Sequence, residues 1–523
     1  MDLSTFTKNF YHVTYNKSEN SIAPYCPEYN DFYYMPQYGL AERRYLYLDD
    51  QQIFERSNTH DSYIVLSEIG FGTGLTFLSA LKLWKQRAQH LQQRPLIYIS
   101  FEKNPLSKKQ LQETLTYWRD ELGEEIDELS ERWVGLLPGV NHLIWLEERV
   151  CLILIIGDAF TEIQRCNFHS THWILDGFSP SRNPDAWALP LLQEISRCSA
   201  DGCTLTSFTG SRVVEKNLTD CGWNVTREKG FALKKYRMTG KYSRKIIKHN
   251  SHLVYQENMT VLGAGIAGMS VGFWRNFFKT NTNCRFVPGL NASCVPHVYL
   301  HPPLHQKLDF FTQLSIRSHV LAGSTYRQLA KLANFNYTAG SVHHKTHTYR
   351  TERVWHLLSQ DIDWQDFVQE TADGYYFPQS GRFHGGLCLQ ALSDLSNQIT
   401  LEKSSPHDAL PSLPYTIACS WAAPIAKDFT MLRGEITLQD NGCYTPSTYD
   451  RYCFKPIARD ISKENFVGFR THTSSYNPVI KQDRAGIFYS VFHGTRGFST
   501  GMLGGLEIAL ESCGIFNYHS NLL

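Results

Sequence analysis

Short hydrophobic, β-rich runs alternate with longer helix-like segments between residues 61 and 240. Four of these runs end in a turn that carries glycine or a carboxylate. This alternation predicts βαβ units and a parallel sheet, in which a ligand binds at the carboxyl ends of the strands. The runs are YIVLSEIG (63–70), LIYISFE (96–102), CLILIIGD (151–158), THWILDGF (171–178) and CTLTSFT (203–209).

A new strand opens at Met259 and ends in a second glycine turn, VLGAGIAG (261–268). The polar stretch before it has no clear periodicity, which indicates a linker. We therefore predict an α/β protein with a Rossmann-like sheet over residues 1–240, a linker at 241–258 and a second α/β domain over 259–523. A chain of 523 residues is too long for one ordinary core, which agrees with this division.

The composition is that of a folded protein. Hydrophobic residues form 42% of the chain, and the formal net charge of +1 indicates no class of partner by itself. The 13 cysteines show no CxxC pairs, which favours reduced thiols over disulfides or a zinc site. The N-terminus does not resemble a signal peptide, and the longest strongly apolar run, Cys151 to Ile156, is too short to cross a bilayer. We expect a soluble, cytoplasmic protein with no membrane partner.

The first glycine turn has the closely spaced pattern GxGxG. Gly70, Gly72 and Gly74 follow a strand, and Glu68 precedes the first of them by two residues. A dinucleotide turn usually has its third glycine three residues after the second, whereas this spacing suits a small ligand without phosphate. A carboxylate beside such a turn suits a cationic amino-acid group, so the pattern favours S-adenosylmethionine. A tight structural turn would explain the same glycines.

Carboxylates at the next two strand ends support this hypothesis. Glu102 ends the second strand, where it could accept hydrogen bonds from two ribose hydroxyls. Asp158 ends the third, where an adenine amino group could be met. Three carboxylates at three successive strand ends make a methyltransferase the favoured interpretation.

The fourth strand end carries the predicted chemistry. Asp176 stands at the strand terminus in WILDGFSPSRNPDAW, and Pro180 and Pro184 stiffen the loop that follows. An amine attacks a methyl sulfonium only when its lone pair is free, and a neighbouring carboxylate can orient the amine and receive its proton. The alternative is that Asp176 serves as a helix N-cap.

Four strings in this half resemble the MnmC family of bifunctional bacterial tRNA-modification enzymes. They are GLAERRYLYL (39–48), EIGFGTGLTFL (68–78), LDGFSPSRNPDAW (175–187) and KGFALKKYRMTG (229–240). The resemblance implies that the N-terminal half methylates 5-aminomethyl uridine at the tRNA wobble position, with Asp176 as the catalytic residue. It also implies that Gly70, Gly72, Gly74 and Glu102 bind S-adenosylmethionine.

The second glycine turn has the spacing of a dinucleotide site. Gly263, Gly265 and Gly268 would bring the backbone and a helix N-terminus against a pyrophosphate. The resemblance continues here in the strings at 373–392, 432–438 and 494–510. It implies an FAD-dependent oxidoreductase that converts 5-carboxymethylaminomethyl to 5-aminomethyl uridine, with Arg496 and Gly497 near the flavin.

One feature of a dinucleotide site is missing from the sequence. An acidic residue about 20 positions after the glycine turn normally holds the adenosine ribose. No Asp or Glu occurs between Gly268 and Leu304. The alternative hypothesis is therefore a methyltransferase whose second domain is a non-catalytic tRNA-binding or structural module.

A basic strip lies between the two predicted domains. Residues 227–248 contain nine Lys or Arg and one glutamate, interleaved with Phe231, Tyr236 and Tyr242. Lysine and arginine would contact phosphates and aromatic rings would stack unpaired bases, so we expect this strip to bind the tRNA anticodon loop. The alternative is a solvated linker. The histidines of SVHHKTHTYR (341–350) lack a neighbouring carboxylate or cysteine, which favours a surface loop over a metal site.

Overall fold

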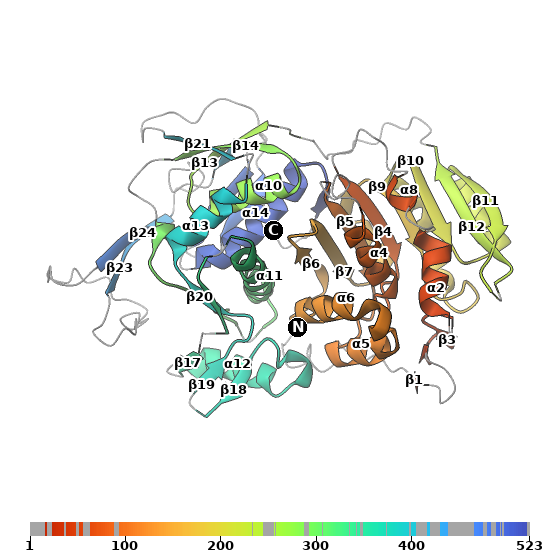
Figure 1. Ribbon diagram of the computed structural model, residues 1–523, viewed down its shortest axis with the longest axis horizontal. Helices are drawn as coiled ribbons and strands as arrows, with labels where there is room; N and C mark the ends of the chain where they lie inside the picture. Colours follow the sequence, from red (N-terminus) through yellow and green to blue (C-terminus); the bar gives the residue numbers. More distant parts are fainter. Residues whose placement is uncertain are drawn as a thin grey trace. The chain divides into compact units, whose positions relative to one another are not determined.

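A computed structural model provides the structure of the chain (Figure 1). It describes residues 16–17, 23–35, 38–48, 52–55, 63–87, 94–232, 234–243, 256, 258–286, 292–305, 307–333, 335–340, 343–345, 349–372, 374–396, 399–403, 416–418, 429–437, 465–473, 478–482, 488–491, 493 and 496–519. The chain divides into two compact units. Unit 1 comprises Met1–Val254, Leu357–Asp366 and Gly514–Leu522, and unit 2 contains the remainder.

Unit 1 is built on an eight-stranded sheet in the order β11-β12-β10-β9-β4-β5-β7-β6. The five central strands β10, β9, β4, β5 and β7 are parallel, and the outer strands are antiparallel to their neighbours. The strands are β4 (Ile64–Ile69), β5 (Leu96–Glu102), β6 (Gly139–Trp145), β7 (Val150–Ile156), β9 (Ser170–Leu175), β10 (Ser199–Ser207), β11 (Trp223–Lys229) and β12 (Tyr236–Tyr242). All five strands predicted from hydrophobic runs are confirmed.

The antiparallel edges were not predicted from the sequence. β12 overlaps the start of the linker expected at 241–258, so residues up to Tyr242 belong to the sheet. β11 and β12 each have one buried residue, Trp223 and Met238, among half-buried and exposed ones, and strands with so few buried apolar residues give a weak hydrophobic signal. Most of the expected linker beyond Ser243 lies outside the described residues.

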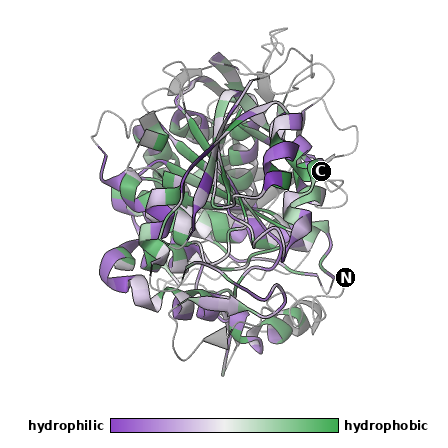
Figure 2. Ribbon diagram, turned by 90° about the vertical axis from the view of Figure 1, so that its right-hand side faces the viewer, coloured by the Kyte–Doolittle hydropathy of each residue, from purple (hydrophilic) through white to green (hydrophobic). Residues whose placement is uncertain are grey.

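Helices flank the unit 1 sheet, and a large hydrophobic core fills the space on one face of the strands. Trp84, Trp145, Phe77 and Tyr98 are fully buried in this core. Figure 2 shows hydrophobic strands inside and hydrophilic colour on the outer faces of helices. The other elements are β1 (Asn16–Lys17), β2 (Pro24–Cys26), β3 (Asp31–Phe32), α2 (Gly39–Arg43), the π-helical turn η1 (Arg44–Leu48), α3 (Gln52–Glu55), α4 (Leu75–Lys85), α5 (Lys108–Leu115), η3 (Thr116–Trp118), α6 (Arg119–Arg132), α7 (Ala159–Ile163), β8 (Cys166–Phe168), η4 (Pro184–Trp187), α8 (Leu189–Arg197) and α9 (Arg212–Asp220).

The strand order of unit 1 reverses at β4. The chain runs from β4 to β5 and β7 on one side, and β9 and β10 lie on the other. In open α/β sheets the crevice at such a reversal is the usual ligand site, because the loops on the two sides leave in opposite directions. The first glycine turn follows β4 and the Asp176 loop follows β9, so both open into this crevice.

Unit 2 contains a six-stranded sheet in the order β21-β14-β13-β22-β26-β25. β13 (Asn258–Leu262), helix α10 (Ile266–Phe277) and β14 (Asn281–Phe286) form a parallel βαβ unit, which confirms the strand predicted near Met259. The remaining strands of the sheet are β21 (Ile399–Lys403), β22 (Thr416–Ala418), β25 (Val479–Gln482) and β26 (Phe488–Val491).

Helix α14 (Gly497–Ser512) packs closely on α10 because glycines recur at every fourth position of α14. A Cβ atom on Gly501 would lie 3.4 Å from the backbone of Ala267, and one on Gly505 would lie 2.7 Å from Ser270. The spacing of four residues places these glycines on one face of the helix. The close approach of the two helices therefore requires glycine at position 505, whereas a Cβ on Gly501 would make an ordinary van der Waals contact.

Smaller elements complete unit 2. They are η5 (Ala292–Cys294), β15 (Val298–Tyr299), α11 (Phe310–Ala333), β16 (Tyr337–Ala339), β17 (His343–Lys345), α12 (Tyr349–Ser359), β18 (Gln369–Thr371), β19 (Gly374–Tyr376), β20 (Gly381–Phe383), α13 (Gly385–Asp394), β23 (Phe429–Thr437) and β24 (Asn465–Thr473). The expectation of a surface loop at 341–350 was wrong at His343 and His344, because β17 pairs with β19.

Two late segments of the chain belong to unit 1. β27 (Phe516–Tyr518) pairs with β8, and the phenolic hydroxyl of Tyr63 donates a hydrogen bond to the carbonyl of Gly514. The short helix η6 (Ile362–Trp364) lies in the segment Leu357–Asp366, where Asp366 forms an ion pair with Lys108 at 2.7 Å. The predicted division at 241–258 takes no account of these returning segments.

Candidate active site

A cavity of about 790 Å³ opens at the carboxyl ends of the central strands of unit 1. Gly70 and Gly72 line it from the turn after β4, Glu102 from the end of β5, Asp158 from the turn after β7 and Asp176 from the turn after β9. Five of the seven residues predicted for this site therefore face one cavity. The size is within the range of small-molecule sites in proteins.

All three glycines of the first turn have left-handed backbone conformations. The φ angles are 90° at Gly70, 55° at Gly72 and 74° at Gly74, which is the N-cap of α4. A Cβ on Gly70 would also lie 3.1 Å from the carbonyl oxygen of Asp176. Glycine is required here because other residues rarely adopt these angles and the two turns approach closely. Gly74 does not line the cavity and acts in shaping the turn.

Glu102 and Asp158 are held by backbone groups. One oxygen of Glu102 accepts a hydrogen bond from the N–H of Gly72 at 2.8 Å, and the other accepts from Asn104 at 2.8 Å. Burial raises the pKa of Glu102, and these N–H donors oppose the rise. Asp158 caps α7 through one oxygen, which accepts from the N–H of Thr161 at 3.0 Å. Each carboxylate retains acceptor capacity toward the cavity, because an ionised carboxylate has about four lone-pair sites.

Glu68 occupies a different position from the one predicted. Its side chain is fully buried on β4, it does not line the cavity, and it accepts a hydrogen bond from the hydroxyl of Ser100 at 2.9 Å. Burial raises the pKa of Glu68 to about 8, and the negative charge of Asp176 adds to the rise. Glu68 therefore does not face the cavity, contrary to the expectation that it contacts the ligand directly. Strand residues alternate between the two faces of a sheet, and this one points into the interior.

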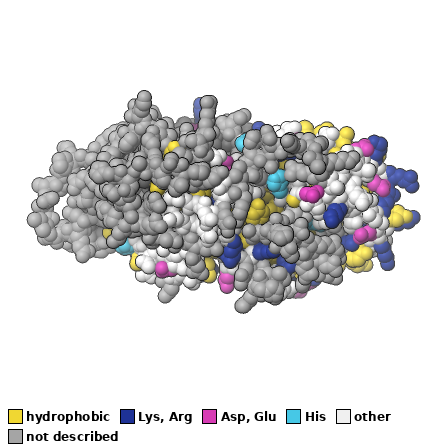
Figure 3. All heavy atoms as spheres, turned by 90° about the horizontal axis from the view of Figure 1, so that it is seen from above, with side chains coloured by type: hydrophobic (Ala, Val, Ile, Leu, Met, Phe, Trp, Pro, Cys, Tyr) yellow, Lys and Arg dark blue, Asp and Glu magenta, His cyan; other side chains and the backbone are white. Residues whose placement is uncertain are grey.

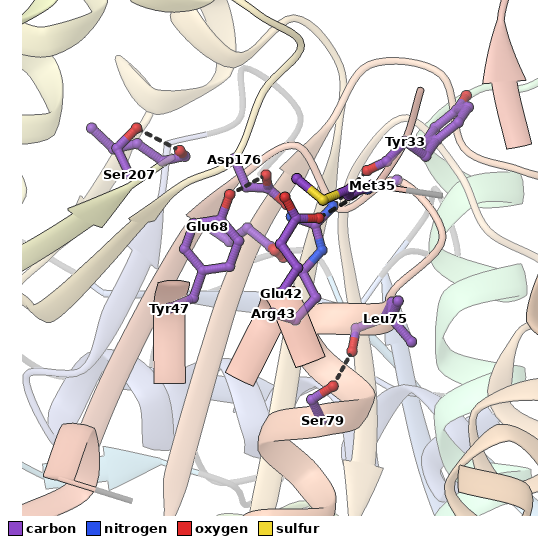
Figure 4. A network of polar contacts seen from close by, with 12 residues as sticks. Tyr33, Met35, Glu42, Arg43, Tyr47, Glu68, Leu75, Ser79, Asp176 and Ser207 are labelled. Carbon is purple, nitrogen blue, oxygen red and sulfur yellow. Dashed lines mark hydrogen bonds and ion pairs between the residues drawn. The ribbon is translucent and has the colours of Figure 1, made fainter. Parts of the chain in front are cut away.

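Asp176 is the centre of a buried polar network (Figure 4). The hydroxyl of Tyr47 donates to its Oδ1 at 2.5 Å, and Arg43 Nη1 lies 2.6 Å from its Oδ2. The exposed fractions of the Arg43 and Asp176 side chains are 4% and 11%. Because α2 and η1 carry Arg43 and Tyr47 one turn apart, both side chains reach the same carboxylate. Asp176 is therefore oriented by two partners, and the alternative of a helix N-cap finds no support in its contacts.

A second ion pair lies beside the first. Lys234 Nζ is 2.6 Å from Oε1 of Glu42, whose other oxygen accepts from the N–H of Met35 at 2.9 Å. Burial alone would raise the pKa of Glu42. The positive charges of Arg43 and Lys234 outweigh this effect and hold that pKa below its ordinary value. For Asp176 the balance is reversed: burial raises its pKa, and Arg43 and Tyr47 oppose the rise. Arg43 and Lys234 both line the cavity, so it contains two cations paired with two carboxylates.

The loop after β9 is braced on both sides. The N–H of Ser179 donates to Asp31 Oδ2 at 3.0 Å, and the indole N–H of Trp187 donates to the carbonyl of Phe178 at 2.8 Å. The Phe178 ring stacks on Tyr29, with ring centroids 4.7 Å apart. These contacts hold the loop in addition to the two prolines noted in the sequence, and they place aromatic rings at the cavity wall.

Sequence reasoning missed the residues that surround Asp176. Arg43, Tyr47 and Glu42 lie within GLAERRYLYL, and Lys234 lies within KGFALKKYRMTG. Both strings carried the family resemblance but lie outside the alternating strands and helices from which the site was predicted. A charged residue at a position that becomes fully buried, such as Glu42, was the available signal, and a single sequence does not reveal burial.

In unit 2 the second glycine turn joins β13 to α10. Gly263 has a φ of 113°, and a Cβ on Gly268 would lie 1.7 Å from the carbonyl oxygen of Gly263. This close approach matches the role of the third glycine in a dinucleotide fold. The first N–H of α10, on Ile266, donates to the hydroxyl of Ser293 at 3.0 Å. The turn fits a pyrophosphate in shape, but no carboxylate follows β14 to hold an adenosine ribose.

Arg496 and Gly497 begin α14. Arg496 is the N-cap residue, and its guanidinium lies 4.1 Å from the ring centroid of Phe311. A Cβ on Gly497 would lie 3.2 Å from the Ile266 side chain, so these two residues lie beside the second glycine turn. Residues 494–495 of the same string are outside the described residues. Their assignment to an FAD site stays a prediction.

The chain is similar to a known family, to curated proteins and to solved structures. A family described as S-adenosyl-L-methionine-dependent methyltransferase matches residues 120–243. The tRNA 5-methylaminomethyl-2-thiouridine biosynthesis bifunctional protein MnmC of Legionella pneumophila (strain Corby) is 29% identical over 350 residues, which are 61% of this chain and 52% of that protein. The resemblance to the MnmC family is confirmed.

The MnmC protein of Stutzerimonas stutzeri (strain A1501) is 32% identical over 269 residues, covering 50% of this chain and 40% of that protein. The chain thus spans about half the length of the curated MnmC relatives it matches. Among solved structures, MNMC2 from Aquifex aeolicus covers 47% of this chain and 75% of its own, with a TM-score of 0.36 and 22% identity.

The described parts of the chain contain neither a candidate membrane span nor a candidate metal site. None of the helices there has the length and apolar character needed to cross a membrane. The same residues contain no group of three or more His, Cys, Asp or Glu side chains arranged to hold a metal ion.

Proposed function

We propose that this protein modifies the wobble uridine of tRNA and that unit 1 methylates the exocyclic amine of 5-aminomethyl uridine. The observation that carries this proposal is the paired carboxylate of Asp176 in a cavity that also presents Gly70, Gly72 and Glu102. S-adenosylmethionine would supply a methyl carbon made electrophilic by its sulfonium. Glu102 would accept hydrogen bonds from its ribose hydroxyls, and Asp158 would meet its adenine amino group.

The ion pairs beside Asp176 favour a neutral amine at this point of the cavity. Arg43 is paired with Asp176 and Lys234 with Glu42, so both carboxylates have a cationic partner before a substrate enters. An ammonium placed here would meet a carboxylate that is already paired, in a poorly solvated site where the charged form of the amine is disfavoured. The amine would therefore lose its proton on entry, which frees the lone pair needed for attack.

Asp176 would then orient the amine by accepting a hydrogen bond from one of its N–H groups. Both carboxylate oxygens have a second lone pair in addition to the one used by Arg43 or Tyr47. When the C–N bond forms, the nitrogen becomes cationic, and Asp176 is positioned to stabilise it and receive the proton. Arg43 and Tyr47 act as positioning residues, since they touch Asp176 and fix its rotamer.

For unit 2 we propose the preceding step, an FAD-dependent conversion of 5-carboxymethylaminomethyl to 5-aminomethyl uridine. The crossing of Gly268 over Gly263 favours a pyrophosphate-binding turn, and the names of the curated relatives include the word bifunctional. Gly263, Gly265 and Gly268 would hold the pyrophosphate, with Arg496 and Gly497 nearby. FAD would supply the oxidant. No Asp or Glu between Gly268 and Leu304 is present to hold its ribose. The alternative is that unit 2 is a non-catalytic tRNA-binding or structural module.

The proposed partner is tRNA, and the proposed location is the cytoplasm, where tRNA modification takes place. The test is nucleoside mass spectrometry of tRNA from cells that lack the gene. Accumulation of 5-aminomethyl uridine would assign only the methyl-transfer step to this protein. Accumulation of 5-carboxymethylaminomethyl uridine would assign both steps, and an unchanged nucleoside profile would refute the proposal.

A further inference from the structure

Three aromatic residues form a cluster on the surface of unit 1 that the methyl-transfer chemistry does not use. Tyr38 is the N-cap residue of α2, Tyr45 lies in η1, and Phe231 lies in the loop between β11 and β12. The Phe231 ring centroid is 6.1 Å from that of Tyr38 and 5.5 Å from that of Tyr45. We call these three residues the aromatic rim.

The rim is exposed and held in place. The exposed fractions are 47% for Tyr38 and 40% for Tyr45, which are large values for aromatic side chains. The hydroxyl of Tyr45 donates to the carbonyl of Lys229 at 3.2 Å, and the guanidinium of Arg237 lies 5.0 Å from the Tyr45 ring centroid. Two flanking elements therefore fix the Tyr45 ring, which lowers the entropy cost of stacking a ligand on it.

The rim and the cavity share their supporting elements. The N–H of Lys234 donates to the carbonyl of Phe231 at 2.9 Å, and Lys234 lines the cavity. Tyr38 stands one helical turn before Glu42, the ion-pair partner of Lys234, and the Glu42 N–H donates to the Tyr38 carbonyl. One turn of helix rises about 5.4 Å, so Tyr38 and the ion pair at the cavity lie close together along α2.

Two lysines without an acidic partner among the described residues lie beside the rim. Of the six Lys and Arg residues in the described part of the basic strip, three have acidic partners: Arg227 pairs with Glu215, Lys234 with Glu42, and Arg237 with Glu228. The other three, Lys229, Lys235 and Lys241, are exposed and form no ion pair with a described residue. Lys229 and Lys235 lie at the turn between β11 and β12 that carries Phe231, whereas Lys241 lies farther along β12. Figure 3 shows Lys and Arg side chains beside hydrophobic and acidic ones on the part of unit 1 that carries β11 and β12. Aromatic faces beside unpaired lysines match the chemistry of single-stranded nucleic acid.

We propose that the aromatic rim is a stacking site for the unpaired nucleobase next to the uridine in the cavity, with Tyr45 as the ring that the base contacts. This inference rests on the proposed function of unit 1 and adds a specificity site to it. Target uridines in a loop with a stacked neighbour would bind more tightly than the same nucleotide alone. The rim would thereby select an unstacked loop over a duplex, in which neighbouring bases are already stacked.

The test uses the full-length protein and RNA stem-loops that carry 5-aminomethyl uridine in the loop. One stem-loop is intact, and two others lack the base on the 5′ or the 3′ side of the target. Base-stacking energies predict that Tyr45→Leu raises KM for the intact stem-loop about five- to a hundredfold with little change in kcat. With the stem-loop that lacks the stacked base, Tyr45→Leu should have no further effect on KM.

Controls separate stacking from structural damage. Tyr45→Trp should retain the low KM, because its ring still stacks, and Tyr38→Leu should reproduce part of the effect if Tyr45→Leu does not fold. Tyr117→Leu changes another exposed tyrosine, on η3, and should leave KM unchanged. An equal rise in KM for intact and base-lacking stem-loops, or no rise with the intact one, would overturn the stacking site. Failure of the wild-type protein to methylate any stem-loop would instead refute the proposed function.

Discussion

The phenolic oxygen of Tyr47 lies 2.5 Å from Oδ1 of Asp176, and these two residues are 129 positions apart in the chain. The contact joins the π-helical turn that precedes the sheet to the loop after β9. With the ion pair from Arg43, it leaves the carboxylate a single orientation toward the cavity.

Replacing Asp176 by Asn should reduce methyl transfer by about a hundredfold or more. The amide retains the size and one acceptor but has no charge and does not take a proton from the amine. Affinity for S-adenosylmethionine, measured by calorimetry, should change little, because Gly70, Gly72 and Glu102 remain. Near wild-type turnover of the Asn variant on 5-aminomethyl uridine tRNA would show that Asp176 only holds the loop after β9 in place.

Tyr47→Phe removes a hydrogen bond that opposes the rise in the Asp176 pKa. The pKa of Asp176 should therefore increase, and the acidic limb of the kcat–pH profile should move to higher pH. Turnover at neutral pH should fall about tenfold through loss of orientation. An unshifted profile with a uniform fall in rate would show that Tyr47 contributes only to folding.

Glu102→Ala should weaken S-adenosylmethionine binding and have a smaller effect on kcat at saturating cofactor. The ribose does not change during methyl transfer, so the contact should contribute equally to ground state and transition state. Calorimetry and saturation kinetics on one preparation would measure both quantities. Unchanged cofactor affinity together with a large loss of kcat would contradict the ribose assignment.

Glu68→Gln should stabilise the protein at pH 8 and have much less effect at pH 5. Because the pKa of Glu68 is raised to about 8 in the folded state, the folded protein holds a proton that the unfolded chain has released. Stability is therefore lost as pH rises from the unfolded pKa near 4.5 toward 8. The neutral Gln avoids this loss, which should be at least about 1 kcal/mol. Thermal unfolding of the variant and the wild type at pH 5 and pH 8 measures this difference in stability. An equal difference at the two pH values would indicate that Glu68 is ionised in the folded protein.

Residues 1–254 should bind S-adenosylmethionine one to one as an isolated fragment. Every residue that lines the cavity falls between Cys26 and Lys234, so the site is complete within this range. The fragment lacks β27, however, and should unfold at a lower temperature than a version that retains the strand. If only the full chain binds the cofactor in calorimetry, the site depends on a segment beyond Val254.

The contribution of β27 itself can be measured in the full chain. Phe516 has an exposed fraction of 4% and packs 6.0 Å from the ring centroid of Phe168. Phe516→Ala should therefore destabilise unit 1 by about 3 kcal/mol, the usual cost of removing a buried ring. Tyr117→Ala, at an exposed tyrosine, is the matched control. Equal denaturant midpoints for the two variants would show that β27 adds nothing to stability.

The sequence by itself determined the parallel strands of unit 1 and the residues at their carboxyl ends. Hydrophobic runs that finish in glycine or a carboxylate identify both, because buried parallel strands are continuously apolar and their ends meet at one edge of the sheet. Gly70, Glu102, Asp158 and Asp176 were found in this way, and they face one cavity.

Only the tertiary structure decided what surrounds Asp176. Arg43, Tyr47 and Lys234 come from segments without a strand or helix pattern, and their side chains meet because α2, η1 and the loop after β11 fold over the sheet. Glu68 shows the complementary limit: its position beside the glycine turn is visible in the sequence, but the face of β4 that carries it is set by packing of the layers. Contacts between distant segments depend on how the whole chain packs, which local patterns along the sequence do not encode.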